Sequence, residues 1–177
     1  MGLMLPVSAR GTLAGTATAK ASRGGFLDLT RAPDRVIIQT TAGSQALRAG
    51  SAGRWMSDNG IVVTAAERSG TLNIALDSPT VATMRLYLRW RGDMSATRLI
   101  VGDAWERAYG DLEWRTWVPD RVMPWYFATT DGSVTNTYGV RTGARAFCYW
   151  QVDERGISLC ADVRSGSEGV ELGERTL

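Results

Sequence analysis

Short segments of alternating apolar and polar residues constrain the fold of this chain more than any other feature. They recur at intervals of about 8 to 12 residues, which is typical of a β-sandwich. The clearest segment, residues 81–90, alternates apolar and polar side chains. Its apolar face, formed by Ala82, Met84, Leu86, Leu88 and Trp90, is predicted to point to the core, and the opposite face, formed by Thr83, Arg85, Tyr87 and Arg89, is predicted to point to solvent. No long window repeats its apolar residues with the helical period of about 3.6. The sequence therefore predicts an all-β protein, an antiparallel β-sandwich with little helix.

The segments that predict strands are bounded by glycine, proline and aspartate clusters, which favour turns. A stretch rich in glycine, alanine and serine, residues 41–53, predicts a surface loop, and Ser69-Gly70 predicts a hairpin turn. Beyond Leu172 we expect no closing strand. Predicted strands cover residues 27–30, 35–40, 61–65, 71–77, 81–90, 98–101, 112–117, 121–128, 137–141, 145–152 and 157–164.

The domain organisation follows from the distribution of large side chains. Residues 1–25 are rich in glycine, alanine, serine and threonine, which predicts a flexible N-terminal arm. Residues 26–177 predict one β-sandwich domain, and a total of 177 residues is the usual size of a single domain. The C-terminus of that domain is expected to be truncated, because no cap follows the last apolar residues.

The chain has no histidine, which excludes several kinds of chemistry at once. Ser-His-Asp and Cys-His catalysis, histidine-ligated zinc and an imidazole pH switch all need that side chain. No metal or cofactor motif is recognisable, so we expect no cofactor and no metal. The net charge is only +2 and the basic residues are scattered, which argues against nucleic acid as a partner. No apolar run is long enough to span a membrane and no convincing signal peptide is present, which slightly favours the cytoplasm.

Two cysteines, Cys148 and Cys160, lie on the two arms of the predicted C-terminal hairpin. A register that places Trp150 opposite Ser158 would align them, whereas a slip of one residue would put them on opposite faces. Free thiols are the favoured prediction.

Most aromatic residues lie between positions 105 and 150. Tryptophan and tyrosine rings stack on the apolar faces of sugars, so this cluster suits a carbohydrate surface. The alternative is that most of these rings belong to the core or to a domain interface. Trp105, Trp125 and Tyr126 are the best candidates for exposure, because they lie next to predicted turns.

Carboxylates in the same region raise the question of glycoside cleavage, which needs two carboxyl groups on either side of the bond. Neighbours on one strand do not easily flank a bond, and nearby arginines favour salt bridges instead. The carboxylates are Asp103, Glu106, Asp111 and Glu113, and the arginines are Arg107 and Arg115. No catalytic residue is therefore predicted from them.

Six motifs resemble bacterial α-galactosidase-like (melibiase) proteins of glycoside hydrolase family 36. They are GDAWERAYGDLEWR (102–115), RVMPWYF (121–127), DG (131–132), TYGVRTG (137–143), AFCYWQVD (146–153) and DVR (162–164). In that family a large N-terminal β-sandwich precedes a (β/α)8 barrel, which carries two catalytic aspartates without counterparts among these motifs. The resemblance therefore implies a supersandwich-like β-sandwich.

The resemblance implies a non-catalytic accessory domain that packs on a catalytic barrel or supports a homo-oligomer. It also implies that a galactoside contacts the loop containing Asp103, Trp105, Glu106 and Arg107. The alternative function is a stand-alone carbohydrate-binding module with Trp105, Trp125 and Tyr126 as its aromatic platform, and a third is an enzyme that uses two of the carboxylates named above.

Overall fold

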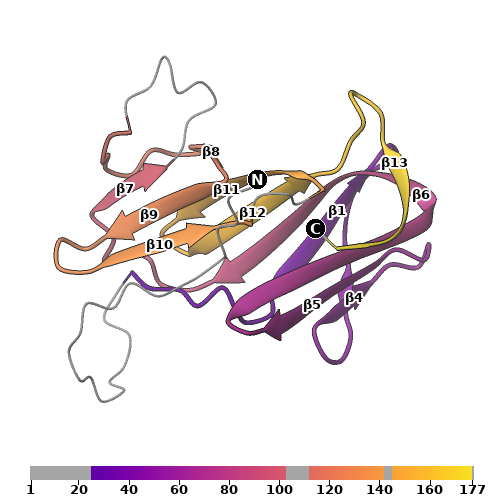
Figure 1. Ribbon diagram of the computed structural model, residues 1–177, viewed down its shortest axis with the longest axis horizontal. Helices are drawn as coiled ribbons and strands as arrows, with labels where there is room; N and C mark the ends of the chain where they lie inside the picture. Colours follow the sequence, from indigo (N-terminus) through magenta and orange to yellow (C-terminus); the bar gives the residue numbers. More distant parts are fainter. Residues whose placement is uncertain (1–24, 103–111, 142–144, 177) are drawn as a thin grey trace, which may run out of the picture.

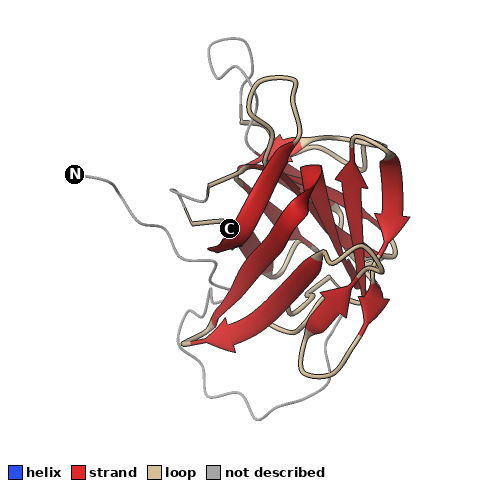
Figure 2. Cartoon of the chain, turned by 90° about the vertical axis from the view of Figure 1, so that its right-hand side faces the viewer, coloured by secondary structure: helices blue, strands red, loops and turns tan. Residues whose placement is uncertain are grey.

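The computed structural model describes residues 25–102, 112–141 and 145–176, and over these residues it contains strands and loops but no helix (Figure 2). All strand pairs are antiparallel. The prediction of an all-β fold is confirmed. Of the predicted arm, residues 1–25, all but Gly25 lies outside the described residues.

Thirteen strands follow one another in the described ranges. They are β1 (Arg35–Thr40), β2 (Gly43–Ala46), β3 (Arg48–Ala49), β4 (Arg54–Met56), β5 (Val62–Arg68), β6 (Thr71–Arg91), β7 (Leu99–Gly102), β8 (Met123–Pro124), β9 (Tyr126–Thr130), β10 (Thr135–Gly139), β11 (Phe147–Asp153), β12 (Gly156–Asp162) and β13 (Val170–Thr176).

Strand β6 organises the larger sheet, whose main path is β3-β4-β5-β6-β12-β11-β8 (Figure 1). Its first half pairs with β5 and its second half pairs with β1 and β12. From the alternation of side chains we predicted two separate strands here, residues 71–77 and 81–90. The strand continues because the hydroxyl of Ser78 donates to the carbonyl of Val81 at 2.7 Å, while Pro79 is exposed.

One part of the core lies between the larger sheet and a three-stranded sheet in the order β10-β9-β7. Figure 1 shows β9 and β10 lying over β11 and β12. At this contact the ring of Phe127 stacks on Tyr138, with centroids 4.8 Å apart, and packs on Trp150 at 5.5 Å. These rings are almost fully buried, so part of the predicted aromatic cluster belongs to the core.

The region 121–128, predicted as one strand, is divided at Trp125. The backbone of Trp125 has φ of 64°, a left-handed conformation that is unusual for a bulky residue. Its carbonyl accepts hydrogen bonds from Val140 N at 3.0 Å and Trp150 Nε1 at 3.1 Å, and these hold the bend. The break moves the chain from β8 in the larger sheet to β9 in the smaller sheet.

Four further predictions differ from the structure. Residues 27–30 alternate in burial but form no strand, because Leu27 N donates to the Tyr138 hydroxyl rather than to a neighbouring strand. The predicted loop 41–53 contains β2 and β3, and residues 112–117 form only an isolated bridge between Arg115 and Ile100. The predicted absence of a closing strand is also wrong, since β13 pairs with β6.

The C-terminal hairpin β11–β12 and the Ser69-Gly70 turn are confirmed. Tyr149 pairs with Cys160 and Cys148 with Ala161, so the two cysteines face opposite sides of the sheet. Both thiols are free, as predicted. Both are also buried, and burial raises the pKa of Cys148 to about 12.

Candidate functional site

The face of β1, β6, β12 and β11 that points away from the core forms an ordered surface, which we name the outer face. Register places its side chains in three rows that cross these four strands. The rows are Arg35-Arg89-Ser158-Gln151, Ile37-Tyr87-Cys160-Tyr149 and Gln39-Arg85-Asp162-Phe147. Most of these side chains are half-buried by their neighbours.

The middle row is aromatic and largely closed to water. Cys160 lies between Tyr87 and Tyr149 and is only 2% exposed. Burial raises the pKa of Tyr149 first, and the adjacent Cys160 thiol and Tyr87 hydroxyl raise it further. The row therefore presents neutral, amphipathic side chains whose rings can bury against a partner.

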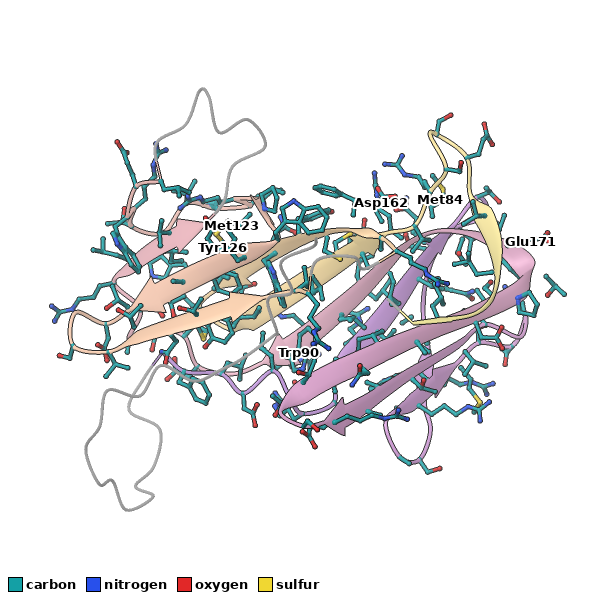
Figure 3. The ribbon with its side chains drawn as sticks, viewed as in Figure 1. Met84, Trp90, Met123, Tyr126, Asp162 and Glu171 are labelled. Carbon is teal, nitrogen blue, oxygen red and sulfur yellow. The ribbon has the colours of Figure 1, made fainter. Side chains whose placement is uncertain are left out.

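The third row is built around Asp162, which lies near the end of β12 beside Met84 of β6 (Figure 3). Arg85 Nε donates to Asp162 Oδ2 at 2.9 Å, and Arg164 Nη2 donates to the same oxygen at 2.6 Å. Partial burial alone would raise the pKa of Asp162, but these two arginines lower it to about 2. The same cluster borders an open cleft of about 540 Å³ lined by Arg145, Ala146, Phe147, Asp162, Arg164 and Gly166.

Acid should weaken the protein through Asp162. Because the folded pKa of about 2 lies below the ordinary value, Asp162 stabilises the fold above about pH 4, and this stabilisation is lost as pH falls toward 2. Solvent screening limits the contribution to about 1 kcal/mol. Urea unfolding between pH 7 and pH 2.5 should show a smaller decrease in stability for Asp162→Asn than for the wild type. An equal decrease in both proteins would contradict this assignment.

The first row ends in a groove of about 320 Å³. Its walls come from three strands and from the loop that precedes β8, and its lining residues are Arg89, Trp117, Val118, Pro119, Asp120, Gln151, Val152, Asp153, Glu154 and Ser158. Arg89 is fixed there by hydrogen bonds to Ser158 Oγ at 3.0 Å and Asp153 Oδ1 at 2.6 Å.

Only some of the predicted site residues can be placed. Asp103, Trp105, Glu106, Arg107 and Asp111 lie outside the described residues. The first four form the loop that the family resemblance links to a sugar.

Trp125 and Tyr126 are half-buried rather than fully exposed. Tyr126 is labelled in Figure 3. The ring of Trp125 packs edge-on against Phe147, with centroids 5.1 Å apart. Trp125 N donates to the Cys148 carbonyl at 3.1 Å, which holds the backbone of Trp125 against β11. The structure therefore does not bring Trp125 into the groove, and Trp117 is the tryptophan found there.

The ionisable groups favour structural roles. Glu113 and Arg115 form an exposed ion pair at 3.3 Å, as the sequence predicts for this region. Every carboxyl group with a resolved pKa shift in the described residues has a lowered pKa; these groups are Asp34, Asp93, Asp131, Asp153 and Asp162. No cluster suited to a metal ion occurs in residues 25–102, 112–141 and 145–176, and the same ranges contain no helix that could cross a membrane.

Sequence reasoning assigned Arg85, Tyr87 and Arg89 to the solvent side of one strand but did not identify the outer face. The available signal was alternation, which fixes the two faces of a strand but not its neighbours. Compared with known proteins, the chain matches no family model, no curated protein and no solved structure.

Proposed function

We propose that this chain is a non-catalytic accessory β-sandwich domain of an α-galactosidase-like glycoside hydrolase. Its outer face packs against a (β/α)8 catalytic barrel or against a second copy of the chain. The observation that carries the proposal is the composition and order of the outer face, and the family assignment comes from the six sequence motifs.

The outer face has the composition of a protein interface. Tyrosine, phenylalanine and arginine are enriched in such interfaces, and the outer face contains Tyr87, Tyr149, Phe147 and three arginines. Its side chains are anchored before binding, because Arg85 and Arg89 are held by Asp162 and Asp153. Ordered side chains lose less conformational entropy when a partner docks.

The carboxyl groups support a non-catalytic role. A glycosidase needs one carboxyl group with a raised pKa, so that it can donate a proton at neutral pH. Asp153 borders the groove, but hydrogen bonds from Arg89 and from Arg155 N lower its pKa despite partial burial. We expect the chain alone to release no nitrophenol from a nitrophenyl α-galactoside.

Binding to a separately produced catalytic barrel of a family 36 α-galactosidase tests the proposal. The wild type should associate with the barrel or with itself in sedimentation experiments. The double variant Tyr87→Ala/Tyr149→Ala should associate at least tenfold more weakly, because truncating two aromatic contact residues costs about 2 kcal/mol or more.

Val134→Ala is the matched control, because Val134 is 53% exposed in the turn between β9 and β10 of the other sheet. This variant should bind as the wild type does. Thermal melts establish that the double variant is folded. Equal association of the double variant and the wild type, or no association of any kind, would overturn the proposal.

A further inference from the structure

We propose that the groove between the loop 117–120 and the ends of β6, β11 and β12 binds a neutral sugar ring, with Trp117 as its stacking surface. This inference goes beyond docking by the outer face. It also differs from the expected platform of Trp105, Trp125 and Tyr126, because none of those residues lines the groove.

The aromatic wall is held firmly. Trp117 Nε1 donates to the carbonyl of Thr97 at 3.1 Å, so its ring is attached to the segment before β7. The next four residues form a turn closed by a hydrogen bond from Arg121 N to the Val118 carbonyl at 3.3 Å. Pro119 and Asp120 occupy the central positions, and Asp120 has φ of 55°, as a type II turn requires.

The opposite wall consists of polar side chains on strands. Gln151 Nε2 donates to the Asp120 carbonyl at 3.3 Å, which joins β11 to the loop. Arg89 is fixed by Ser158 and Asp153, as described above, and Asp153 Oδ1 also accepts from Arg155 N at 2.7 Å. Side chains supported in this way keep their geometry when a ligand arrives, which favours binding.

Several hydrogen-bond donors and acceptors that line the groove are available to a ligand. Within the part of the chain that the structure describes, Gln151 Oε1, Asp153 Oδ2 and the Glu154 carboxylate make no hydrogen bond. The Ser158 hydroxyl accepts from Arg89 and keeps its own proton to donate. A ligand that alternates donors and acceptors around a ring satisfies these groups, as sugar hydroxyls do.

The charge of the groove selects against ions. Three carboxylates, from Asp120, Asp153 and Glu154, face one arginine, Arg89, so an anion would be repelled. A cation would also bind weakly, because Asp153 is already paired with Arg89. A volume of about 320 Å³ lies at the small end of ligand sites, which suits one sugar ring.

Isothermal titration of the full chain with methyl α-galactopyranoside, methyl α-glucopyranoside and galacturonate tests this proposal. At least one methyl glycoside should bind saturably at millimolar concentrations, and galacturonate should bind more weakly because of its carboxylate. Trp117→Ala should weaken binding roughly tenfold or abolish it, since it removes the stacking surface. Glu154→Gln should weaken binding severalfold.

Trp114→Ala is the matched control, because Trp114 lies in the same loop, is 44% exposed and does not line the groove. It should leave binding unchanged. If Trp117→Ala is unfolded, Glu154→Gln decides the question, because Glu154 is exposed in a hairpin turn. No saturable binding of either glycoside, or equal binding by the wild type and the folded groove variants, would overturn the proposal. Because no barrel is present, this result is independent of the docking test.

Discussion

Replacing Gly156 with alanine is expected to destabilise the protein by about 2 to 5 kcal/mol, from backbone strain and overpacking together. Gly156 begins β12 with φ of 141°, a conformation that residues with a side chain rarely adopt. An added Cβ would lie 2.0 Å from the Trp90 carbonyl oxygen and 3.1 Å from Arg91 Cα. Both atoms belong to the backbone of β6, so the central pairing of the larger sheet must shift.

Gly43→Ala separates the two causes. Gly43 has φ of 126°, but no atom lies within 4 Å of its added Cβ. This control therefore carries only the conformational cost, about 1 to 2 kcal/mol. In urea unfolding, the free energy of unfolding should be clearly lower for Gly156→Ala than for Gly43→Ala. Equal stabilities would show that β6 and β12 are not packed as the structure describes.

Trp150→Ala should cost about 3 to 5 kcal/mol, the range for a buried aromatic residue. Trp150 is 1% exposed and contacts rings from both sheets, Trp90 at 6.5 Å and Phe127 at 5.5 Å between centroids. Its Nε1 also donates to the Trp125 carbonyl, so the substitution removes a hydrogen bond at the bend between the sheets. The result would be a large cavity in the centre of the core.

Two further variants check this reason. Trp150→Phe keeps much of the ring and should cost less than Trp150→Ala, although it leaves the Trp125 carbonyl with one partner fewer. Trp114→Ala removes the same side chain from an exposed position and should change stability by no more than about 0.5 kcal/mol. If Trp150→Ala and Trp114→Ala unfold at the same urea concentration, the assignment of Trp150 to the core is wrong.

The fold was predictable where side-chain alternation and turn chemistry agree. The hairpin β11–β12 and the apolar face containing Leu86, Leu88 and Trp90 could be located from the sequence alone. Alternation does not determine which strands become neighbours, so the pairing of β6 with β1, β12, β5 and β13 was not predictable. The break at Trp125 depends on hydrogen bonds from Val140 N and Trp150 Nε1, which lie farther along the chain. The continuous β6 depends on its pairing with strands that are distant in the sequence, β1 and β12.

The candidate site was less predictable for the same reason. The outer face exists because residues from β1, β6, β11 and β12 align in register, and the chain separates some of them by more than a hundred residues. The groove needs the loop 117–120 to meet β11, where Gln151 Nε2 donates to the Asp120 carbonyl, and such a contact between a loop and a strand has no local sequence signal. Aromatic clustering indicated a region rich in rings but could not separate core rings such as Tyr138 from surface ones.

Hydroxyl-radical footprinting with mass spectrometry tests the central claim most directly, because it reports which side chains a partner covers. The chain should be oxidised alone and with the separately produced family 36 barrel. We predict that oxidation of Tyr87 and Tyr149 falls several-fold on addition of the barrel. Met56, which is 37% exposed on β4, should be oxidised to the same extent in both samples. Unchanged oxidation of both tyrosines, in a chain that sedimentation shows to be monomeric, would contradict an accessory domain that docks through its outer face.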